Sequence, residues 1–370
     1  MKICFLANPA SSHTQKWVEH FCNRGDEVHL ICFEDPSRIT PKARVHRLSV
    51  LWGPLRYFAA ARQVKTILKT VQPDLLHAHY AAGYGTLGRL SDFHPYIVSV
   101  WGSDVFEVPE RSPVHEFLIT KNLASADQVC STSIFMAEHT RKYYMGRITV
   151  TPFGVDCQRF RPLEYPDQND EFVIGTVKSL EQPYGLEHLI RAFALLTNKY
   201  HKSKHIRLVI AGDGTLRHKL QKLAEHLNIA GSTEFLGNVP QEQLPALLSR
   251  FTLFVIPSVF ETFGVAVLEA SACGLSVVAS NLPGLCEVLE PNETALLAPA
   301  GDEVATANAM FRLLENKPLR KAMGAAGRKF VLGRYQWLDT AVHMEQLYES
   351  IVSPKPYVER TLVSPAATLL

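Results

Sequence analysis

Long hydrophobic runs are missing from this 370-residue sequence. No segment approaches the ~20 apolar residues of a transmembrane helix. The opening stretch Met1–Ala10 has too short an apolar run for a signal peptide and no small-residue cleavage pattern. The seven cysteines include no Cys-x-x-Cys pair, which indicates reduced thiols and not a disulfide framework. We therefore expect a cytoplasmic protein, at most peripheral at the inner face of the membrane.

An excess of one charge is also missing. The formal net charge of +2 is too small to indicate a nucleic-acid partner. The N-terminal half is mildly basic, and its predicted helix over residues 54–71 carries four basic and no acidic side chains: Arg56, Arg62, Lys65 and Lys69. The helix has one apolar stripe formed by Ala60, Val64, Ile67, Leu68 and Val71. Such a helix can lie on an anionic membrane, but a stripe of this kind more often packs on its own sheet.

Several cofactor and metal motifs are absent as well. There is no Asp-x-Asp pair and no Gly-x-Gly-x-x-Gly after the first predicted strand, which argues against a dinucleotide dehydrogenase. His77 and His79 share one face of a predicted strand, but no third ligand at suitable spacing joins them. We therefore expect no cofactor and no metal ion.

Alternating strand and helix patterns run through both halves of the chain. This pattern, with 46% hydrophobic residues, predicts an α/β protein of two domains. The expected N-terminal domain covers residues 1–160 and the C-terminal domain residues 172–336, with a polar linker at 161–171 between them. A final amphipathic helix is expected at 337–352 and a loose tail at 353–370.

One strand–helix–strand unit stands at the centre of the second half. A buried strand is predicted at 251–256, a helix at 265–272 and a further strand at 275–280. Ligands of such parallel sheets bind beyond the carboxyl ends of the strands, where a helix N-terminus favours an anion such as a diphosphate. Gly264 opens this helix and lets the backbone approach such a group closely.

Two carboxylates belong to the same unit. Glu261 lies in the loop before the helix, and Glu269 is the only charged residue of an otherwise apolar helix. A carboxylate in a buried helix needs hydrogen-bond donors, which the diol of a ribose would supply. The alternative is a solvated glutamate on each side of the helix start.

The spacing of Glu261 and Glu269 around Phe263-Gly264 resembles glycosyltransferase family 4, whose members are retaining enzymes of the GT-B fold. The resemblance implies two Rossmann-like doubly wound domains that face each other across a cleft. It also implies that Glu261 contacts the donor sugar and Glu269 the ribose. The backbone of Phe263, Gly264 and Val265 would then face the diphosphate.

Further donor residues follow from the same resemblance. Lys178, at the end of the strand predicted at 171–177, would bind the diphosphate and act with Glu261 in catalysis. Gly212 and Gly214 would lie under the donor, and Val239 would meet the nucleobase. The family's second lysine is replaced here by Tyr184.

The acceptor side of the cleft is expected to contain three residues of the first domain. His13 either touches the donor phosphate or the acceptor, or helps to cap the helix that begins near Thr14. Trp101 occupies the place of a family histidine and either stacks on a sugar ring or fills the floor between the domains. Asp104 is expected to make a polar contact.

Together these features predict an enzyme that transfers a hexosyl group from a nucleoside diphosphate sugar, UDP being preferred, with retention. The expected acceptor is a carbohydrate, a glycolipid or a polysaccharide precursor, and a peripheral contact with an anionic membrane is a further expectation. Two alternatives remain: a sugar-nucleotide-binding protein without activity, and an epimerase or phosphorylase of the same fold.

Overall fold

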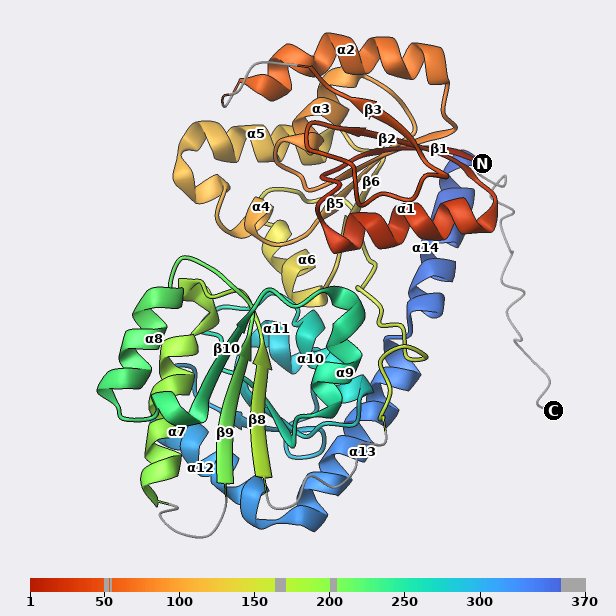
Figure 1. Cartoon of the computed structure of the whole chain (residues 1–370). Coiled ribbons are helices and arrows are strands. Elements are labelled where there is room, and N and C mark those ends of the chain that lie inside the picture. Colours follow the sequence, from red (N-terminus) through yellow and green to blue (C-terminus); the bar gives the residue numbers. More distant parts are fainter. Residues whose placement is uncertain (50–52, 54, 164–170, 200–204, 354–370) are drawn as a thin grey trace, which may run out of the picture.

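The computed structural model describes residues 1–49, 53, 55–163, 171–199 and 205–353. Within these ranges the chain forms two α/β domains, each built on a parallel sheet, one above the other in Figure 1. The predicted fold class of two doubly wound domains is confirmed. The expected linker at 161–171 and tail at 353–370 lie for the most part outside the described residues.

The N-terminal sheet has the strand order β3-β2-β1-β4-β5-β6-β7, with every pair parallel. Its strands are β1 (Lys2–Leu6), β2 (Glu27–Cys32), β3 (Arg44–Arg47), β4 (Leu75–His79), β5 (Tyr96–Val100), β6 (Gln128–Ser131) and β7 (Ile148–Val150). Its helices are α1 (Ser12–Arg24), α2 (Arg56–Val71), α3 (Tyr84–Ser91), α4 (Ser103–Phe106), α5 (Pro113–Ala124) and α6 (Ile134–Thr140), with a short 3-10 turn, η1 (Pro109–Arg111).

The C-terminal sheet has the order β10-β9-β8-β11-β12-β13, again parallel throughout. Its strands are β8 (Glu171–Val177), β9 (His205–Ala211), β10 (Thr233–Gly237), β11 (Leu253–Ile256), β12 (Val277–Ser280) and β13 (Ala295–Ala298). The helices are α7 (Leu186–Lys199), α8 (Arg217–His226), α9 (Leu244–Ser249), α10 (Val265–Ala272), α11 (Pro283–Cys286), α12 (Glu303–Glu315), α13 (Lys317–Arg334) and α14 (Trp337–Val352). Three 3-10 turns complete this half: η2 (Gln182–Tyr184), η3 (Ala230–Ser232) and η4 (Gln241–Gln243).

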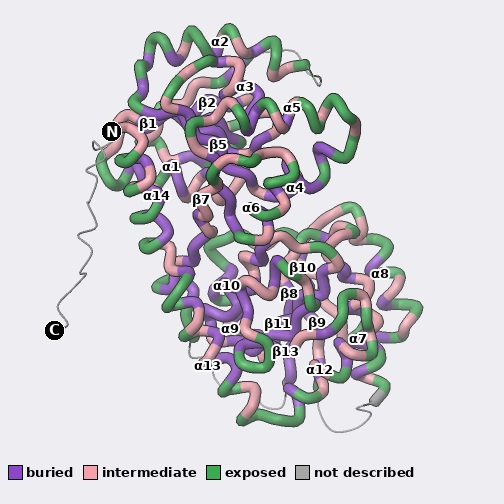
Figure 2. Tube along the Cα trace, turned by 180° about the vertical axis from the view of Figure 1, so that it is seen from behind, coloured by how far each residue is buried: buried purple, intermediate pink, exposed green. Residues whose placement is uncertain are grey.

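Both sheets form because their central strands are short apolar runs that are buried on both faces, as Figure 2 shows by the purple trace through each domain. In each sheet the strand order reverses at one place, between β1 and β4 and between β8 and β11. Ligands of doubly wound sheets bind at such a switch point, beyond the carboxyl ends of the strands. The fold therefore provides one such place in each domain.

The last helix, α14, packs on the first domain and not on the second. Its residues Ala341, Met344 and Tyr348 are buried in the same cluster as Phe5 of β1, and the Tyr348 ring stacks on Phe21 with centroids 5.0 Å apart. The end of the described chain thus helps to form the core of the N-terminal domain.

The two places where the chain passes between the domains are hydrogen-bonded to each other. Val155, on the way out of the first domain, forms a parallel bridge with Gln336, on the way back. The N–H of Val155 donates to the carbonyl of Tyr335 at 2.8 Å, and the N–H of Trp337 donates to the carbonyl of Val155 at 2.9 Å. The two passages therefore form a single connection.

Elsewhere the domains meet at the N-terminus of α6. The Oγ of Ser133 donates to the carbonyl of Thr262 at 3.0 Å. The backbone N–H groups of Ile134 and Phe135 donate to the carboxylate of Glu287, at 2.8 and 3.1 Å. A carboxylate of the second domain therefore caps a helix of the first.

The apolar stripe of α2 faces the protein. Ala60, Val64, Leu68 and Val71 are buried on the N-terminal domain. This arrangement is the packing alternative stated for this helix. A membrane contact of α2 would therefore rest on its basic residues and not on the stripe.

Candidate active site between the two domains

Two adjoining cavities open at the carboxyl ends of β8 and β9. The larger, about 630 Å³, lies between α1 of the first domain and η4, α9 and α10 of the second. The smaller, about 300 Å³, is lined by Lys178, Tyr184, Gly212 and Val239. Val177, Gln241 and Leu244 line both, so the two cavities form one continuous site. Of the predicted donor residues, Lys178, Gly212 and Val239 line the smaller cavity, and Val265 and Glu269 line the larger.

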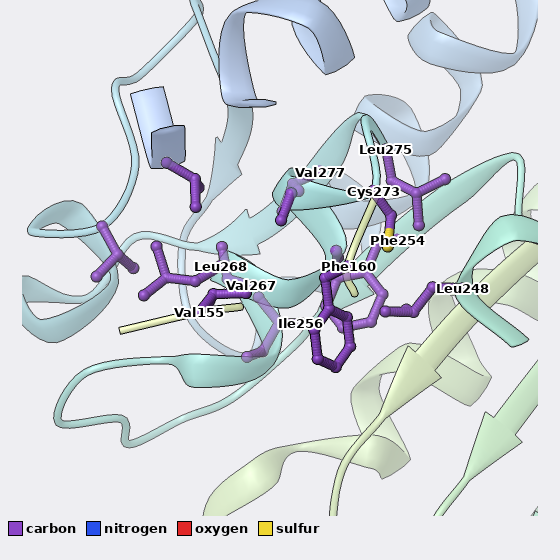
Figure 3. Packing of buried hydrophobic residues seen from close by; sticks show 14 of the residues in the cluster. Val155, Phe160, Leu248, Phe254, Ile256, Val267, Leu268, Cys273, Leu275 and Val277 are labelled. Atoms are coloured by element: carbon purple, nitrogen blue, oxygen red, sulfur yellow. The ribbon is translucent and has the colours of Figure 1, made fainter. Parts of the chain in front are cut away.

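Helix α10 is held rigidly beside this space. Val267 and Leu268 are fully buried against β11, in the cluster shown in Figure 3. Gly264 precedes the helix at φ 96°, and a Cβ atom there would lie 2.7 Å from Leu285 Cδ2. Only glycine fits both demands. Phe263 is buried, whereas Val265 and Ala266 line the larger cavity, so the first turn of α10 faces the site.

Lys178 and Glu261 are brought into direct contact. The ammonium group of Lys178 donates to Oε2 of Glu261, which also accepts from the Ser258 hydroxyl at 3.4 Å. The Lys178 Nζ lies 4.2 Å from the centroid of the Tyr184 ring. The tyrosine that replaces a lysine thus supports the remaining one through a cation–π contact.

Glu269 projects into the larger cavity from α10. Its Oε1 accepts a hydrogen bond of 2.8 Å from the Gln241 side-chain amide. Burial raises the pKa of Glu269 to about 7, although the Gln241 hydrogen bond and the charge of Lys16 lower it. A buried carboxylate is stabilised by a ligand that offers hydroxyl groups as hydrogen-bond donors.

Gly212 and Gly214 form the turn after β9. Gly212 has φ 139°, and a Cβ there would lie 1.9 Å from the backbone oxygen of Lys178. A Cβ on Gly214 would lie 2.5 Å from the backbone oxygen of Leu180. The glycines therefore let the β9 turn pack directly on the segment that carries Lys178. Of the two, Gly212 lines the smaller cavity.

On the first domain His13 and Trp101 belong to one aromatic cluster. The His13 ring stacks on Phe153 with centroids 3.7 Å apart and packs edge-on against Trp101 at 5.9 Å. Burial lowers the pKa of His13 to about 4, so the imidazole is neutral at pH 7. His13 lines the larger cavity, whereas Ser11, and not His13, caps α1.

Asp104 is fully buried away from both cavities. Its carboxylate accepts backbone N–H groups from Ala81 at 2.7 Å, Gly102 at 2.8 Å and Trp101 at 3.1 Å. Burial raises its pKa to about 6, against these bonds. In this structure Asp104 holds the turn after β5 and is not free to contact an acceptor, so the expected polar contact has no support here.

The cavity residues that were not predicted from the sequence include three polar side chains near Glu269. Gln241 holds Glu269, and Lys16 of α1 and Arg159 line the larger cavity beside it. Gln241 directly follows the segment at 235–240 that was assigned to the nucleobase, and Lys16 lies one helical turn after Ser12. For Gln241 and Lys16, closeness in the chain to a predicted site residue was the available sequence signal.

Metal and membrane features can be judged only for the described residues. Among these, no group of three His, Cys, Asp or Glu side chains could hold a metal ion. His77 donates to or accepts from Tyr348 and Ser99 and is part of the core. A membrane span would need a longer or more apolar helix than any in these ranges.

Comparison with known proteins identifies the chain. Residues 162–330 match the family described as glycosyl transferases group 1, and residues 2–133 match glycosyl transferase 4-like. An uncharacterized glycosyltransferase of Methanocaldococcus jannaschii is 31% identical over 371 residues, covering 91% of this chain and 93% of its own. The chain belongs to glycosyltransferase family 4. It is an enzyme that uses a sugar-nucleotide donor.

Other relatives of this family 4 enzyme have named activities. N-acetyl-alpha-D-glucosaminyl L-malate synthase of Bacillus anthracis is 22% identical over 90% of this chain and 92% of its own. D-inositol 3-phosphate glycosyltransferase of Corynebacterium urealyticum is 29% identical over 75% and 72%. The substrates in these names are those of the relatives.

Solved structures confirm that the family 4 enzyme has the GT-B fold. Sucrose-phosphate synthase from Thermosynechococcus elongatus superposes with a TM-score of 0.83 at 24% identity, over 95% of this chain and 99% of that chain. Anabaena HepE in complex with UDP gives a TM-score of 0.80 at 18% identity, over 95% and 100%.

Proposed function

We propose that this enzyme transfers a hexosyl group, with retention, from a UDP-sugar to a glycolipid or polysaccharide precursor. The supporting observation is the arrangement around the joined cavities. The first turn of α10 and Glu269 line the larger cavity, and Lys178, which contacts Glu261, lines the smaller one beside it. In a nucleoside diphosphate sugar the diphosphate lies between the sugar and the ribose, which matches Glu261 for the sugar, Lys178 and the start of α10 for the diphosphate, and Glu269 for the ribose.

In this proposal each group has one task. The N-terminus of α10 and Lys178 stabilise the charge that develops on the departing diphosphate. Glu261 accepts hydroxyls of the transferred sugar, and Glu269 accepts those of the ribose. Gly212, Gly214 and Val239 form the wall beside the nucleotide. The ring of His13, which lines the larger cavity, would be the contact of the aromatic cluster with an acceptor sugar.

The mechanism places no protein nucleophile at the anomeric carbon. The acceptor hydroxyl attacks on the face from which the diphosphate leaves, and the departing phosphate oxygen takes the hydroxyl proton. The glycosidic bond to the acceptor forms as the bond to the phosphate breaks, which retains the configuration. A peripheral position at the cytoplasmic membrane face would bring a glycolipid acceptor to the basic N-terminal domain.

The experiment is incubation of the purified enzyme with labelled UDP- and GDP-sugars and a membrane extract. Release of UDP with label entering lipid or polysaccharide supports the proposal, and proton NMR of the product gives its anomeric configuration. Tight nucleotide binding without turnover would support a binding protein instead. Release of GDP alone, or an inverted product, would contradict the donor or the retention.

A further inference from the structure

The charge of Lys178 is already engaged before a donor binds. Its ammonium group contacts Glu261, and the side chains are only 15% and 10% exposed. The adjoining Tyr184 adds no charge. A nucleoside diphosphate brings at least two negative charges into this space, and the pair of Lys178 and Glu261 is neutral as a unit. A further cation is therefore needed on the wall of the site.

Lys16 of α1 stands on the opposite wall. It lines the same 630 Å³ cavity as Val265 and Ala266 of the first turn of α10 and as Glu269. Lys16 belongs to the first domain and Val265 and Ala266 to the second, so the two domains contribute these residues to one cavity.

Two contacts hold the Lys16 ammonium group. Its Nζ donates to the carbonyl of Gly154 at 2.7 Å and lies 4.1 Å from the centroid of the Trp337 ring. Among the described residues it forms no ion pair; burial lowers its pKa to about 8, and the charges of Glu269 and Asp156 oppose this lowering. Since an ammonium group has three N–H donors, one hydrogen bond to Gly154 leaves donors for a ligand.

We infer that Lys16 is a donor-binding residue whose ammonium group contacts the diphosphate of the sugar nucleotide across the cleft from α10. This inference rests on the proposed function. The diphosphate would then lie between the N-terminus of a helix of one domain and a cation of the other. Lys16 supplies the positive charge that Lys178, paired with Glu261, does not.

The test compares a ligand that has the diphosphate with one that lacks it. Lys16→Met keeps an apolar stem of similar length against Trp337 and removes the charge. We expect UDP to bind Lys16→Met ~10-fold more weakly by calorimetry, the loss of one charged hydrogen bond, and uridine to bind unchanged. Lys222→Met, on exposed α8, is the matched control and should bind both as the wild type does.

A second measurement uses the unaltered protein, so it does not depend on the folding of a variant. UDP should protect Lys16 from acetylation by acetic anhydride, read by mass spectrometry, whereas uridine should not and Lys222 should label equally throughout. Equal loss of UDP and uridine binding in Lys16→Met, or unchanged labelling, would overturn the inference. A wild-type protein that binds neither UDP nor GDP would instead overturn the proposed function.

Discussion

The ammonium group of Lys178 and the carboxylate of Glu261 form one ion pair, although 83 positions separate them in the chain. The two groups cannot act independently. A donor sugar that hydrogen-bonds Glu261 shares that carboxylate with Lys178, and a phosphate that binds Lys178 draws it away from Glu261.

Variants of this pair should therefore be non-additive. Lys178→Ala should lower kcat and raise the donor KM together by ~10-fold or more, since a diphosphate is present in ground and transition states. Glu261→Gln should lower kcat more than it raises KM, because it misplaces the reacting sugar. The double variant should lose ~1–3 kcal/mol less than the sum of the single effects in steady-state kinetics. Strictly additive effects would mean that the pair has no role in turnover.

Glu269 should act through binding of the nucleotide. Glu269→Gln exchanges one acceptor oxygen for a donor, which should weaken UDP binding ~10-fold or more at about 1.5–3 kcal/mol per charged hydrogen bond. Glu261→Gln should bind UDP, which lacks the sugar, almost normally. Calorimetry with UDP and GDP on both variants measures this difference, and equal affinities would refute the assignment of ribose to Glu269.

Glu269 should also make stability depend on pH. Its pKa of about 7 in the folded protein lies above its ordinary value of 4.5, so the folded chain holds a proton that the unfolded chain releases. The stability it contributes is present at acidic pH and is lost as the pH rises from about 4.5 through 7, by at most ~3 kcal/mol. Glu269→Gln should therefore gain stability relative to the wild type between pH 5 and pH 8. Urea denaturation of both proteins at several pH values checks this, and a constant difference would contradict it.

Gly212 should tolerate no side chain. Gly212→Ala combines an unfavourable φ of 139° with a Cβ placed 1.9 Å from the Lys178 backbone oxygen. We expect a loss of ~1–3 kcal/mol or more in the free energy of unfolding and weaker UDP binding, since the Lys178 segment must shift. The control is Gly231→Ala, where no atom lies within 4 Å, and its effect should stay within about 0.5 kcal/mol. Equal stabilities of the two variants would contradict this packing argument.

The membrane expectation can be tested on α2. Exchange of Arg62, Lys65 and Lys69 for Gln should weaken sedimentation with anionic vesicles if these residues touch lipid. Salt should weaken it similarly, since the Debye length is about 8 Å at physiological ionic strength. Unchanged sedimentation would leave α2 as a helix that only packs on its domain through Val64 and Leu68.

The α10 unit could be predicted because its information is local. A buried strand, a glycine that begins a helix, and a single charge at Glu269 follow each other within about twenty residues. Contacts between residues far apart in the chain produce no such local sequence pattern. The contacts of His13 with Phe153 and of Lys16 with Gly154 join α1 to a segment far along the chain, which no local periodicity describes.

Local pattern can also mislead. Asp104 was predicted to contact a ligand, but its carboxylate accepts backbone N–H groups from Trp101 and Gly102 of its own turn and from Ala81 after β4. A Gly-x-Gly-x-x-Gly sequence does occur at 83–88, before and within α3. Its Gly83 faces the ring of Tyr57 and its Gly88 that of Tyr96, with a built Cβ 2.5 and 2.3 Å from ring atoms. Tyrosine rings and not phosphates occupy the space that these glycines leave.

The bridge between Val155 and Gln336 makes the two chain passages a single pivot. A rotation about this pivot that moved α6 away from Glu287 would separate the domains on that side. Such a rotation would break the hydrogen bonds from the N–H groups of Ile134 and Phe135 to the carboxylate and expose the N-terminus of α6 to water. Loss of such a cap costs about 0.5–2 kcal/mol. The Glu287 carboxylate therefore stabilises this relative placement of the two domains by the same amount.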